Sequence, residues 1–326
     1  MPSPAHVQSA PGAAVADIAV NDVRVRLRRG VRRKRRSAQR AVVALGLLLP
    51  SLAVLALFTY APIVQVVWDS VHTRRAPGIG ASFAGLANYQ AILADAAFRN
   101  AAINNLIYAV GTVGPSLVIA LGFALALARS TQVNNLLRAF FFMPVLIPLV
   151  AAASLFLFIF LPNVGLLDFY LGRFLSRPPN WLGDPDVALY SIMALTVWKN
   201  AGYYMLFFLA GLQAVPDEAY EAAYLEGATS WQRLFHITLP YLKPTTAFVA
   251  VIALINVVTQ VDHVFVLTKG GPSDSTNLLL FYVYQQAVES YDIGKAAAGT
   301  LVSLAVLVAV TAVSLGTLEN AFGGRT

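Results

Sequence analysis

Polar side chains recur at helical spacing inside one long apolar stretch of the chain. They stand at positions i, i+3, i+4 and i+7: Asn256, Thr259, Gln260 and His263. This spacing predicts that all four lie on one face of a helix. Amide, hydroxyl and imidazole groups both donate and accept hydrogen bonds, so such a face suits a hydroxyl-rich solute. Because polar groups are costly inside a bilayer, we predict that this face lines a solute pathway.

A second apolar stretch carries polar and aromatic residues of the same kinds, namely Lys199, Asn200, Tyr203 and Tyr204. Lys199 and Tyr203 are four residues apart and share a helical face, which adds a donor and an aromatic platform. A structural interpretation stays open beside the pathway. In it, Asn256 and Thr259 hydrogen-bond between neighbouring helices, and Lys199 pairs with Asp262 near the outer surface.

The elements that must position these side chains are membrane helices. The chain has 326 residues, 58% hydrophobic and 12% charged, with a mean hydropathy of +0.66, whereas soluble domains carry about 25% charged residues. Six continuously apolar blocks are long enough to cross a bilayer, near 41–68, 101–128, 139–161, 187–211, 246–267 and 295–318. Their lack of period-two alternation favours helices over barrel strands. The predicted fold class is therefore all-α and polytopic, and the short apolar segment 278–288 is predicted to be a surface or re-entrant helix.

A basic arm precedes the first span. Residues 24–40 are rich in arginine and predict a cytoplasmic N-terminus, and six spans return the C-terminus to the same side. The predicted organisation is an arm at 1–40, a membrane domain at 41–318 with a cytoplasmic loop at 212–243, and a tail at 319–326. We expect the arm, which supplies much of the net charge of +7, to contact anionic lipid and not nucleic acid, because it lacks interleaved aromatic residues.

Catalytic and metal-binding signatures are missing from the sequence. It contains no phosphate-binding G-x-x-x-x-G-K-[ST] loop, no cysteine and no paired histidines, since His6, His72, His236 and His263 are scattered. We therefore predict no catalytic site, no metal site and no ATP hydrolysis on this chain.

The segment 221–240 is unusually polar for its place between two apolar blocks. Pro216 and Asp217 predict a helix start, and Gly227 predicts its left-handed end. Thr229 or Ser230 then predicts the cap of a second short helix.

That second helix is predicted to carry an aromatic stripe and to end at a proline. Trp231, Leu234 and Phe235 share one face, and Pro240 is predicted to end the helix. An interfacial helix lying on lipid favours basic flanks, whereas the flanks here are acidic. We therefore predict a docking surface for another protein.

The same segment resembles the EAA loop of the membrane subunits of binding-protein-dependent ABC importers. The motif positions are Glu221, Ala222, Ala223, Gly227, Ile237, Leu239 and Pro240. Four further segments resemble the carbohydrate-importing branch: 83–89, 138–150, 163–168 and 266–272. The resemblance covers about residues 40–318 and leaves out the basic arm.

The resemblance implies that this loop is a coupling helix seated on a cytoplasmic ATPase, with Glu221 and Gly227 at the contact and Trp231 and Phe235 beside them. It implies three kinds of partner: a second homologous six-span subunit, two ATP-binding subunits that hold ATP and magnesium, and an extracytoplasmic solute-binding protein at the outer loops. It also implies a location in the bacterial inner membrane and alternating access as the mechanism.

The solute implied by the resemblance is a sugar, a polyol or a related compound such as glycerol 3-phosphate. A stand-alone ion-coupled secondary transporter is the alternative, because it too needs polar side chains within its spans. Such a transporter has no need of a cytoplasmic docking loop. An intramembrane enzyme is less consistent with the sequence, because Asp262 and His263 are adjacent and point about 100° apart on a helix.

Overall fold

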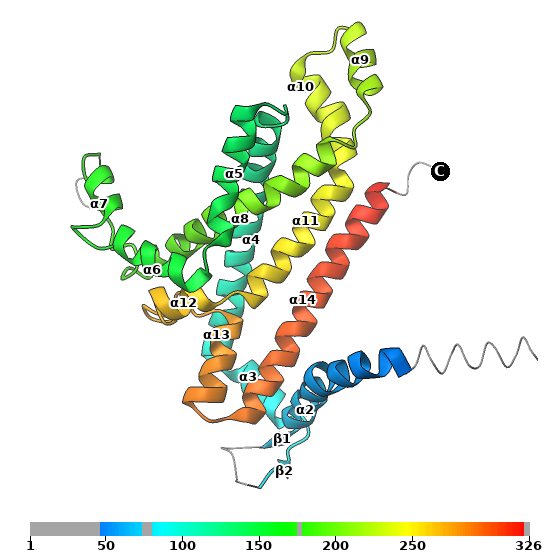
Figure 1. The fold of residues 1–326 in the computed structure, drawn as a ribbon. Coiled ribbons are helices and arrows are strands. Elements are labelled where there is room, and N and C mark those ends of the chain that lie inside the picture. Colours follow the sequence, from blue (N-terminus) through cyan, green and yellow to red (C-terminus); the bar gives the residue numbers. More distant parts are fainter. Residues whose placement is uncertain (1–45, 74–79, 175–177, 323–326) are drawn as a thin grey trace, which may run out of the picture. The chain divides into compact units, whose positions relative to one another are not determined.

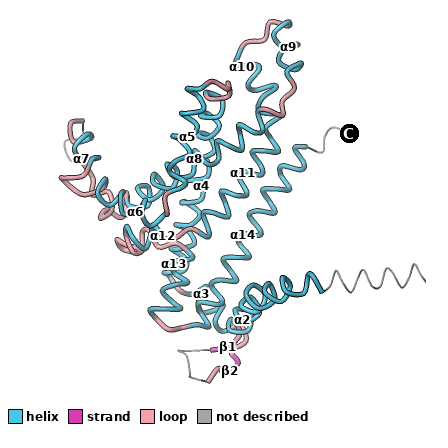
Figure 2. The backbone as a smooth tube through the Cα atoms, in the orientation of Figure 1, coloured by secondary structure: helices cyan, strands magenta, loops and turns pink. Residues whose placement is uncertain are grey.

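The computed structural model describes residues 46–73, 80–174 and 178–322. The basic arm 1–40, the start of the first predicted span and residues 323–326 of the tail lie outside these residues. The described part is almost entirely helical, with one short two-stranded hairpin (Figure 2). The predicted all-α class is confirmed.

The first described helical segment runs from Gly46 to Ser70 and includes a π-helical turn, η1 (Ala56–Tyr60), followed by α2 (Ala61–Ser70). The chain divides into two units after Gln65, and residues 46–65 are the described part of the first. Every described residue of the first unit is exposed. Because most of these exposed side chains are apolar, the helix suits a lipid environment.

A small hairpin and a short helix follow α2. Strand β1 (His72–Thr73) pairs antiparallel with β2 (Ser82–Phe83), and α3 (Ala87–Ala94) comes next. The buried Asn88 amide donates to the carbonyl oxygens of Ser70 at 2.9 Å and His72 at 3.0 Å. Asn88 therefore fixes the hairpin on α3.

Long helices form the body of the second unit: α4 (Ala96–Ala126), α8 (Ala188–Leu212), α11 (Leu239–Thr259) and α14 (Ile293–Phe322). In Figure 1, α4 and α8 lie against α11, and α14 runs along its far side. The buried face of α4 consists mainly of small and polar residues at intervals of three or four: Ala101, Asn105, Tyr108, Thr112, Ser116, Ala120 and Ala124. Such residues let membrane helices approach closely.

The predicted span at 139–161 is a bent pair of helices. Helix α5 (Gln132–Leu146) and α6 (Leu149–Ile159) meet at 98°. Pro148 lacks an N–H and disfavours a helical backbone at the residue before it, and Ile147 is extended, with φ −76° and ψ 128°. The chain therefore leaves the helical path at this point.

Short elements gather at the end of the bundle opposite the 212–243 loop: α12 (Asp262–Leu267), α13 (Leu279–Tyr284) and the π-helical turn η3 (Gln285–Glu289). Helix α7 (Leu166–Leu171) lies in the loop that follows α6. The helix predicted at 278–288 is present as α13 and η3. The Asn104 amide donates to the carbonyl oxygens of Asp274 at 2.8 Å and Asn277 at 3.1 Å, which fixes the loop before α13 to α4.

A buried aromatic side chain connects α13 to the start of α4. The Tyr282 hydroxyl donates to Asp95 Oδ2 at 2.8 Å, and Asp95 also caps α4 by accepting from the Ala97 N–H. Burial, followed by the hydrogen bond and the negative charge of Asp95, raises the pKa of Tyr282. The hydroxyl therefore stays protonated and keeps donating.

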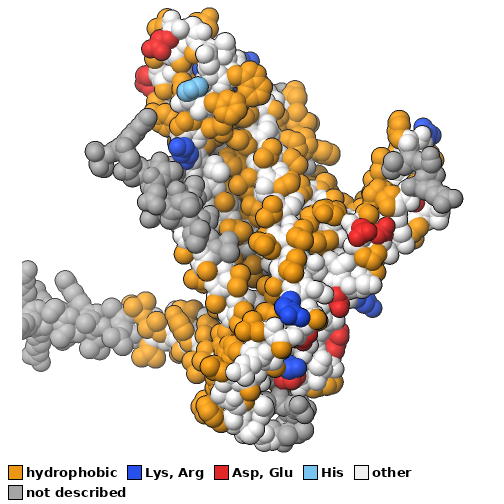
Figure 3. Space-filling view, turned by 180° about the vertical axis from the view of Figure 1, so that it is seen from behind, with side chains coloured by type: hydrophobic (Ala, Val, Ile, Leu, Met, Phe, Trp, Pro, Cys, Tyr) orange, Lys and Arg blue, Asp and Glu red, His pale blue; other side chains and the backbone are white. Residues whose placement is uncertain are grey.

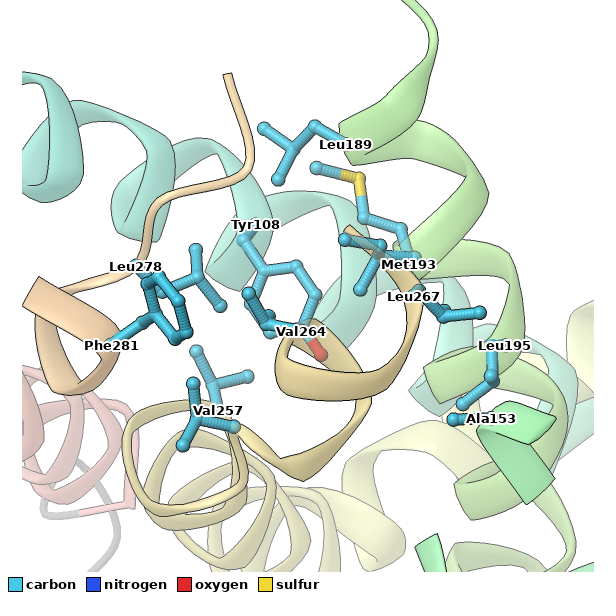
Figure 4. Close-up of a cluster of buried hydrophobic side chains, with 12 residues drawn as sticks. Tyr108, Ala153, Leu189, Met193, Leu195, Val257, Val264, Leu267, Leu278 and Phe281 are labelled. Atoms are coloured by element: carbon cyan, nitrogen blue, oxygen red, sulfur yellow. The ribbon is translucent and has the colours of Figure 1, made fainter. Parts of the chain in front are cut away.

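The described residues form a small buried apolar cluster around Ile92, Phe98 and Tyr282 and two larger ones that fill the interior of the bundle. One, drawn in Figure 4, joins α4, α8, α11, α12 and α13 through side chains such as Tyr108, Met193, Val257, Val264 and Phe281. The other lies closer to the 212–243 loop and includes Ala120, Ala124, Tyr204, Phe208, Leu242 and Val249. A layer of polar side chains lies between the two.

Within the described residues, three helices are long and apolar enough to cross a bilayer: Gly46–Ser70, Ala96–Ala126 and Ser230–Leu267. The bent pair adds a fourth candidate. Helices α8 and α14 coincide with the other two predicted blocks, and the count of six spans stays a prediction. Figure 3 shows hydrophobic side chains over the middle of the bundle, with charged ones toward its ends.

Candidate functional site

The 212–243 loop holds two short helices that meet at a glycine. Helix α9 (Asp217–Leu225) begins after Pro216 and has Asp217 and Glu218 in its first turn, where negative charge suits the helix dipole. Gly227 has φ +78°. Its N–H donates to Tyr224 O at 3.0 Å, and the Ala228 N–H donates to Ala223 O at 2.9 Å. This pair of bonds is a Schellman cap, so the predicted left-handed end at Gly227 is confirmed.

The second helix, α10 (Ser230–Arg233), has Thr229 as its cap. Thr229 Oγ1 accepts from the Gln232 N–H at 3.3 Å, while the Thr229 N–H donates to Gln232 Oε1 at 2.8 Å. The side chain of each residue accepts from the backbone N–H of the other, and this reciprocal pair is a capping box.

The prediction that Pro240 ends this helix is wrong. A π-helical turn, η2 (Leu234–Thr238), follows α10 and runs without a break into α11, with Pro240 in the first turn of α11. The Leu239 N–H donates to Leu234 O, five residues back. The wider turn relieves the clash that a proline ring makes with an ordinary helical turn. The second half of the 212–243 loop, which is predicted above to dock a partner and is called the docking loop below, therefore forms one helical path with α11.

The tip of the loop exposes acidic and aromatic side chains (Figure 3, at the end that carries α9 and α10 in Figure 1). Asp217, Glu218, Glu221 and Glu226 are exposed. Trp231 is 70% exposed and Phe235 57%, and their rings stack with centroids 5.9 Å apart. Large exposed aromatic groups beside charges are typical of protein contacts.

A hollow of about 410 Å³ lies beside Gly227, lined by Ala223, Glu226, Ala228, Arg233, His236 and Ile237 among others. At the base of the loop the Tyr220 hydroxyl and Thr238 Oγ1 lie 2.9 Å apart, so α9 is bonded to η2. The motif residues thus divide in two. Glu221, Ala222, Gly227, Trp231 and Phe235 are exposed, whereas Ala223, Ile237, Leu239 and Pro240 are partly buried and hold the pair together.

The predicted polar face of four residues is interrupted. Helix α11 ends at Thr259, and Gln260 is extended, with φ −94° and ψ 107°. Thr259 is exposed and Gln260 half-buried, whereas His263 lies on α12 and is fully buried. Because the helix breaks between them, the prediction that all four residues share one continuous face is wrong.

Lys199 contacts the bend between α5 and α6. Its Nζ donates to the carbonyl oxygens of Pro144 at 3.2 Å and Val145 at 3.3 Å, and also to that of Ile147. Carbonyls at a helix C-terminus lack their ordinary intrahelical partners. The buried ammonium donates to all three, and Pro144 O also accepts from the Ile147 N–H at 3.3 Å. The predicted alternative that Lys199 pairs with Asp262 is wrong.

Tyr203 and Tyr204 have different surroundings. The Tyr204 hydroxyl is buried and accepts from the Asn256 amide at 3.1 Å, which joins α8 to α11. Tyr203 is half-buried, and its ring packs edge-on against Phe207 with centroids 5.1 Å apart. Asn200, next to Lys199, is buried between α4, α8 and α11.

His263 ends a buried chain of hydrogen bonds. Its Nε2 lies 2.9 Å from the Tyr108 hydroxyl, which lies 2.6 Å from Thr196 Oγ1, and Thr196 donates to Ile192 O at 3.1 Å. Because the last acceptor is a carbonyl, a single direction satisfies the chain: Nε2–H donates to Tyr108, and Tyr108 donates to Thr196. Nδ1 is then the unprotonated nitrogen, and it has no partner among the described residues.

Three polar residues of this interior were not predicted as site residues: Tyr108, Thr112 and Ser116. They recur every four residues along α4, which places them on one face, and this spacing could have revealed them. In the described residues, no group of three His, Asp or Glu side chains is arranged to hold a metal ion.

The chain resembles known membrane transport proteins over most of its length. A family model described as "Binding-protein-dependent transport system inner membrane component" matches residues 118–323. The chain is similar to the sn-glycerol-3-phosphate transport system permease protein of Agrobacterium fabrum, with 31% identity over 277 residues, 84% of this chain and 94% of that one. It is also similar to the trehalose/maltose transport system permease protein of Thermococcus litoralis, with 30% identity over 264 residues, 81% of this chain and 88% of that one.

A solved structure has the same fold. It is that of a bacterial ABC transporter involved in the import of the acidic polysaccharide alginate, with a TM-score of 0.76 and 20% identity, covering 88% of this chain and 99% of that chain.

Proposed function

Because the chain belongs to the family of inner membrane components of binding-protein-dependent transport systems, we propose that it is one of two membrane subunits of an ATP-driven importer in the bacterial inner membrane. It builds half of a solute pathway at its interface with a homologous subunit. ATP and magnesium are bound by two separate ATPase subunits. Both termini of this chain lie in the cytoplasm, and an extracytoplasmic solute-binding protein meets the opposite end.

The observation that carries this proposal is the exposed helix pair α9 and α10 and its unbroken continuation into α11. The pair offers carboxylates, a glycine-lined hollow and a stacked aromatic pair at one tip. Carboxylates form charge-assisted hydrogen bonds with basic side chains, and aromatic groups supply apolar contact area. An ATPase with a basic groove lined by apolar side chains fits this surface.

Coupling follows from the continuity of the helix. Closure of the two ATPases displaces α9 and α10, and α11 passes the displacement to the break at Gln260. The ATP-bound and ATP-free states thereby favour different openings of the pathway, which is alternating access. An ion-coupled secondary transporter needs no such surface, and the family match favours the importer.

The solute pathway is proposed to run along the exposed side of the break. Thr259 and Gln260 present polar atoms there, and the half-buried Tyr203 supplies an aromatic ring. Lys199, Asn256 and His263 lie deeper, where their hydrogen bonds position the helices that carry these groups. Asn200 is buried beside them.

The proposed solute is a sugar, a polyol or a related compound, including glycerol 3-phosphate. The relatives named above are transport system permeases for sn-glycerol-3-phosphate and for trehalose and maltose. All three of these solutes carry several hydroxyl groups. Hydroxyl, amide and aromatic side chains suit such compounds.

The test is to purify the tagged chain from its native host in mild detergent and identify the proteins that accompany it, for wild type and Gly227→Asp. We expect an ATPase and a second membrane subunit with wild type, and loss of the ATPase alone in the variant, which also loses uptake. Gly227→Asn is the matched control, because asparagine has the same size, carries no charge and tolerates a positive φ. Purification of the wild-type chain alone, or normal uptake by Gly227→Asp, contradicts the proposal.

A further inference from the structure

A layer of polar side chains lies inside the bundle where α4, α8 and α11 meet. It surrounds a cavity of about 10 Å³, whose polar lining is Thr112, Ser116, Thr196, Asn200, Tyr204 and Asn256. A cavity of this volume holds about one water molecule.

Most of the layer is already hydrogen-bonded. Thr112 donates to Tyr108 O on its own helix at 2.6 Å, and the Asn256 amide nitrogen donates to the Tyr204 hydroxyl at 3.1 Å. Thr196 accepts from Tyr108 in the chain that ends at His263. The amide oxygen of Asn256 accepts from no group of the described residues.

Two side chains of the layer lack a hydrogen bond. The Asn200 amide and the Ser116 hydroxyl bond to no atom of the part of the chain that the structure describes, although the two residues are only 4% and 2% exposed. Buried polar groups of native proteins nearly always have a partner, from the protein or from ordered water. The partner here must accept from the amide nitrogen of Asn200 and also donate to oxygen atoms.

We propose that the cavity binds one ordered water molecule that joins α4, α8 and α11. The water accepts from the Asn200 amide nitrogen and donates to Ser116 Oγ and to the Asn256 amide oxygen. Three hydrogen bonds are typical of a buried water, and each of them goes to a different helix.

A cation fits the cavity poorly. Its lining contains no carboxylate, and the cationic Lys199 immediately precedes Asn200 on α8. An uncompensated positive charge in an apolar interior is strongly disfavoured. The Asn200 amide also needs an acceptor, which a cation is not. The neutral, amphoteric water satisfies both kinds of group.

The water connects α4 to α11, the helix that continues directly from the docking loop. Asn256 stands near the end of the helical path that starts in the docking loop. In this layer α11 contacts α8 directly through the bond from Asn256 to Tyr204, whereas its polar connection to α4 runs through the water. Loss of the water is therefore expected to loosen α11 from α4 and leave the contact with α8 in place.

The test is an electron cryo-microscopy structure of the assembled importer in lipid nanodiscs, at a resolution that shows ordered water. We expect a density peak within about 2.7–3.2 Å of the Asn200 amide nitrogen, Ser116 Oγ and the Asn256 amide oxygen. A cavity without density overturns the proposal. So does a peak with contacts shorter than hydrogen bonds that disappears when potassium replaces sodium, because that peak is a cation.

Variants test the assignment of the ligands. Asn200→Leu is expected to remove the peak. Ser116→Val, which fills the cavity from α4, is expected to remove it too and replaces the first variant if that one does not assemble. Ser303→Ala is the control, because the Ser303 hydroxyl is buried but already donates to Gly299 O at 2.8 Å, and it is expected to leave the peak unchanged. A peak that persists in Asn200→Leu or Ser116→Val overturns the proposal, and neither result depends on which solute is carried.

Discussion

The ammonium nitrogen of Lys199 lies 3.2 Å from the carbonyl oxygen of Pro144. A buried cation on α8 thus closes the C-terminal end of α5 at the point where the chain bends by 98°. This contact differs from the role in a solute pathway that the sequence predicts for Lys199. Lys199 satisfies backbone groups that have no water available to them and is no longer free to bind a solute.

Lys199→Met is expected to destabilise the bend. Methionine keeps the length of the side chain but leaves the carbonyls of Val145 and Ile147 without this donor, which costs about 1–3 kcal/mol per unsatisfied buried group. Pro144 O loses the ammonium too but still accepts from the Ile147 N–H. Thermal unfolding of the purified complex measures the loss. Lys199→Arg keeps a cationic donor and is expected to lose less, and equal stability of the methionine variant and wild type contradicts the assignment.

Gly202→Ala is expected to be severely destabilising. A Cβ at Gly202 would overlap the carbonyl oxygen of Phe141 on α5, and a backbone atom cannot move aside as a side chain can. The matched control is Gly114→Ala on α4, where a Cβ meets nothing within 4 Å and where alanine raises helix propensity by about 1 kcal/mol. The yield of folded protein in the membrane distinguishes the two, and comparable yields disprove the close approach of α5 and α8.

Trp231→Ala is expected to weaken binding of the ATPase by about thirtyfold or more, because truncation of a central aromatic residue typically costs about 2 kcal/mol or more. The affinity of the purified ATPase for the membrane subunits is the measurement. Phe174→Ala provides the control, since Phe174 is equally aromatic and highly exposed but follows α7, far along the chain from the docking loop. A similar loss in both variants points to a general effect of surface aromatics and argues against a docking role for Trp231.

Tyr108→Phe is expected to lower the free energy of unfolding by about 1–3 kcal/mol, because it leaves His263 Nε2 and Thr196 without the hydroxyl that joins them. A double-mutant cycle with Thr196→Val checks the chain of bonds. The second substitution is expected to cost less in the presence of the first, whereas additive costs indicate that the two side chains do not interact. Tyr190→Phe, at an exposed position on α8, serves as the control.

Local chemistry made the docking loop predictable. Gly227 needs a positive φ, Thr229 caps the second helix, and Pro216 precedes the first helix. Each of these signals acts within a few residues, and the structure confirms each of them. The fold class was equally accessible, since continuous apolar blocks specify helices in a bilayer.

The errors arose where a distant part of the chain or an uncommon turn decides the conformation. Pro240 ordinarily ends a helix, but the π-helical turn η2 before it has no sequence signature of its own. The carbonyls that occupy Lys199 belong to residues more than fifty positions earlier. The bend at 147–148 did have a local signal, because Pro148 restricts Ile147, and an apolar block containing two prolines should have been predicted as a broken span.

Helical continuity from Ser230 to Thr259 also limits which changes in chain length this segment tolerates. Insertions and deletions are usually harmless in connections between membrane helices, because a loop absorbs them. Here each added or removed residue rotates everything beyond it by about 100°, so a single insertion turns Thr259 away from the proposed pathway while the docking loop stays in register with its partner. A change of about seven residues, close to two full turns, nearly restores the original facing, but it shifts the loop about 10 Å along the axis.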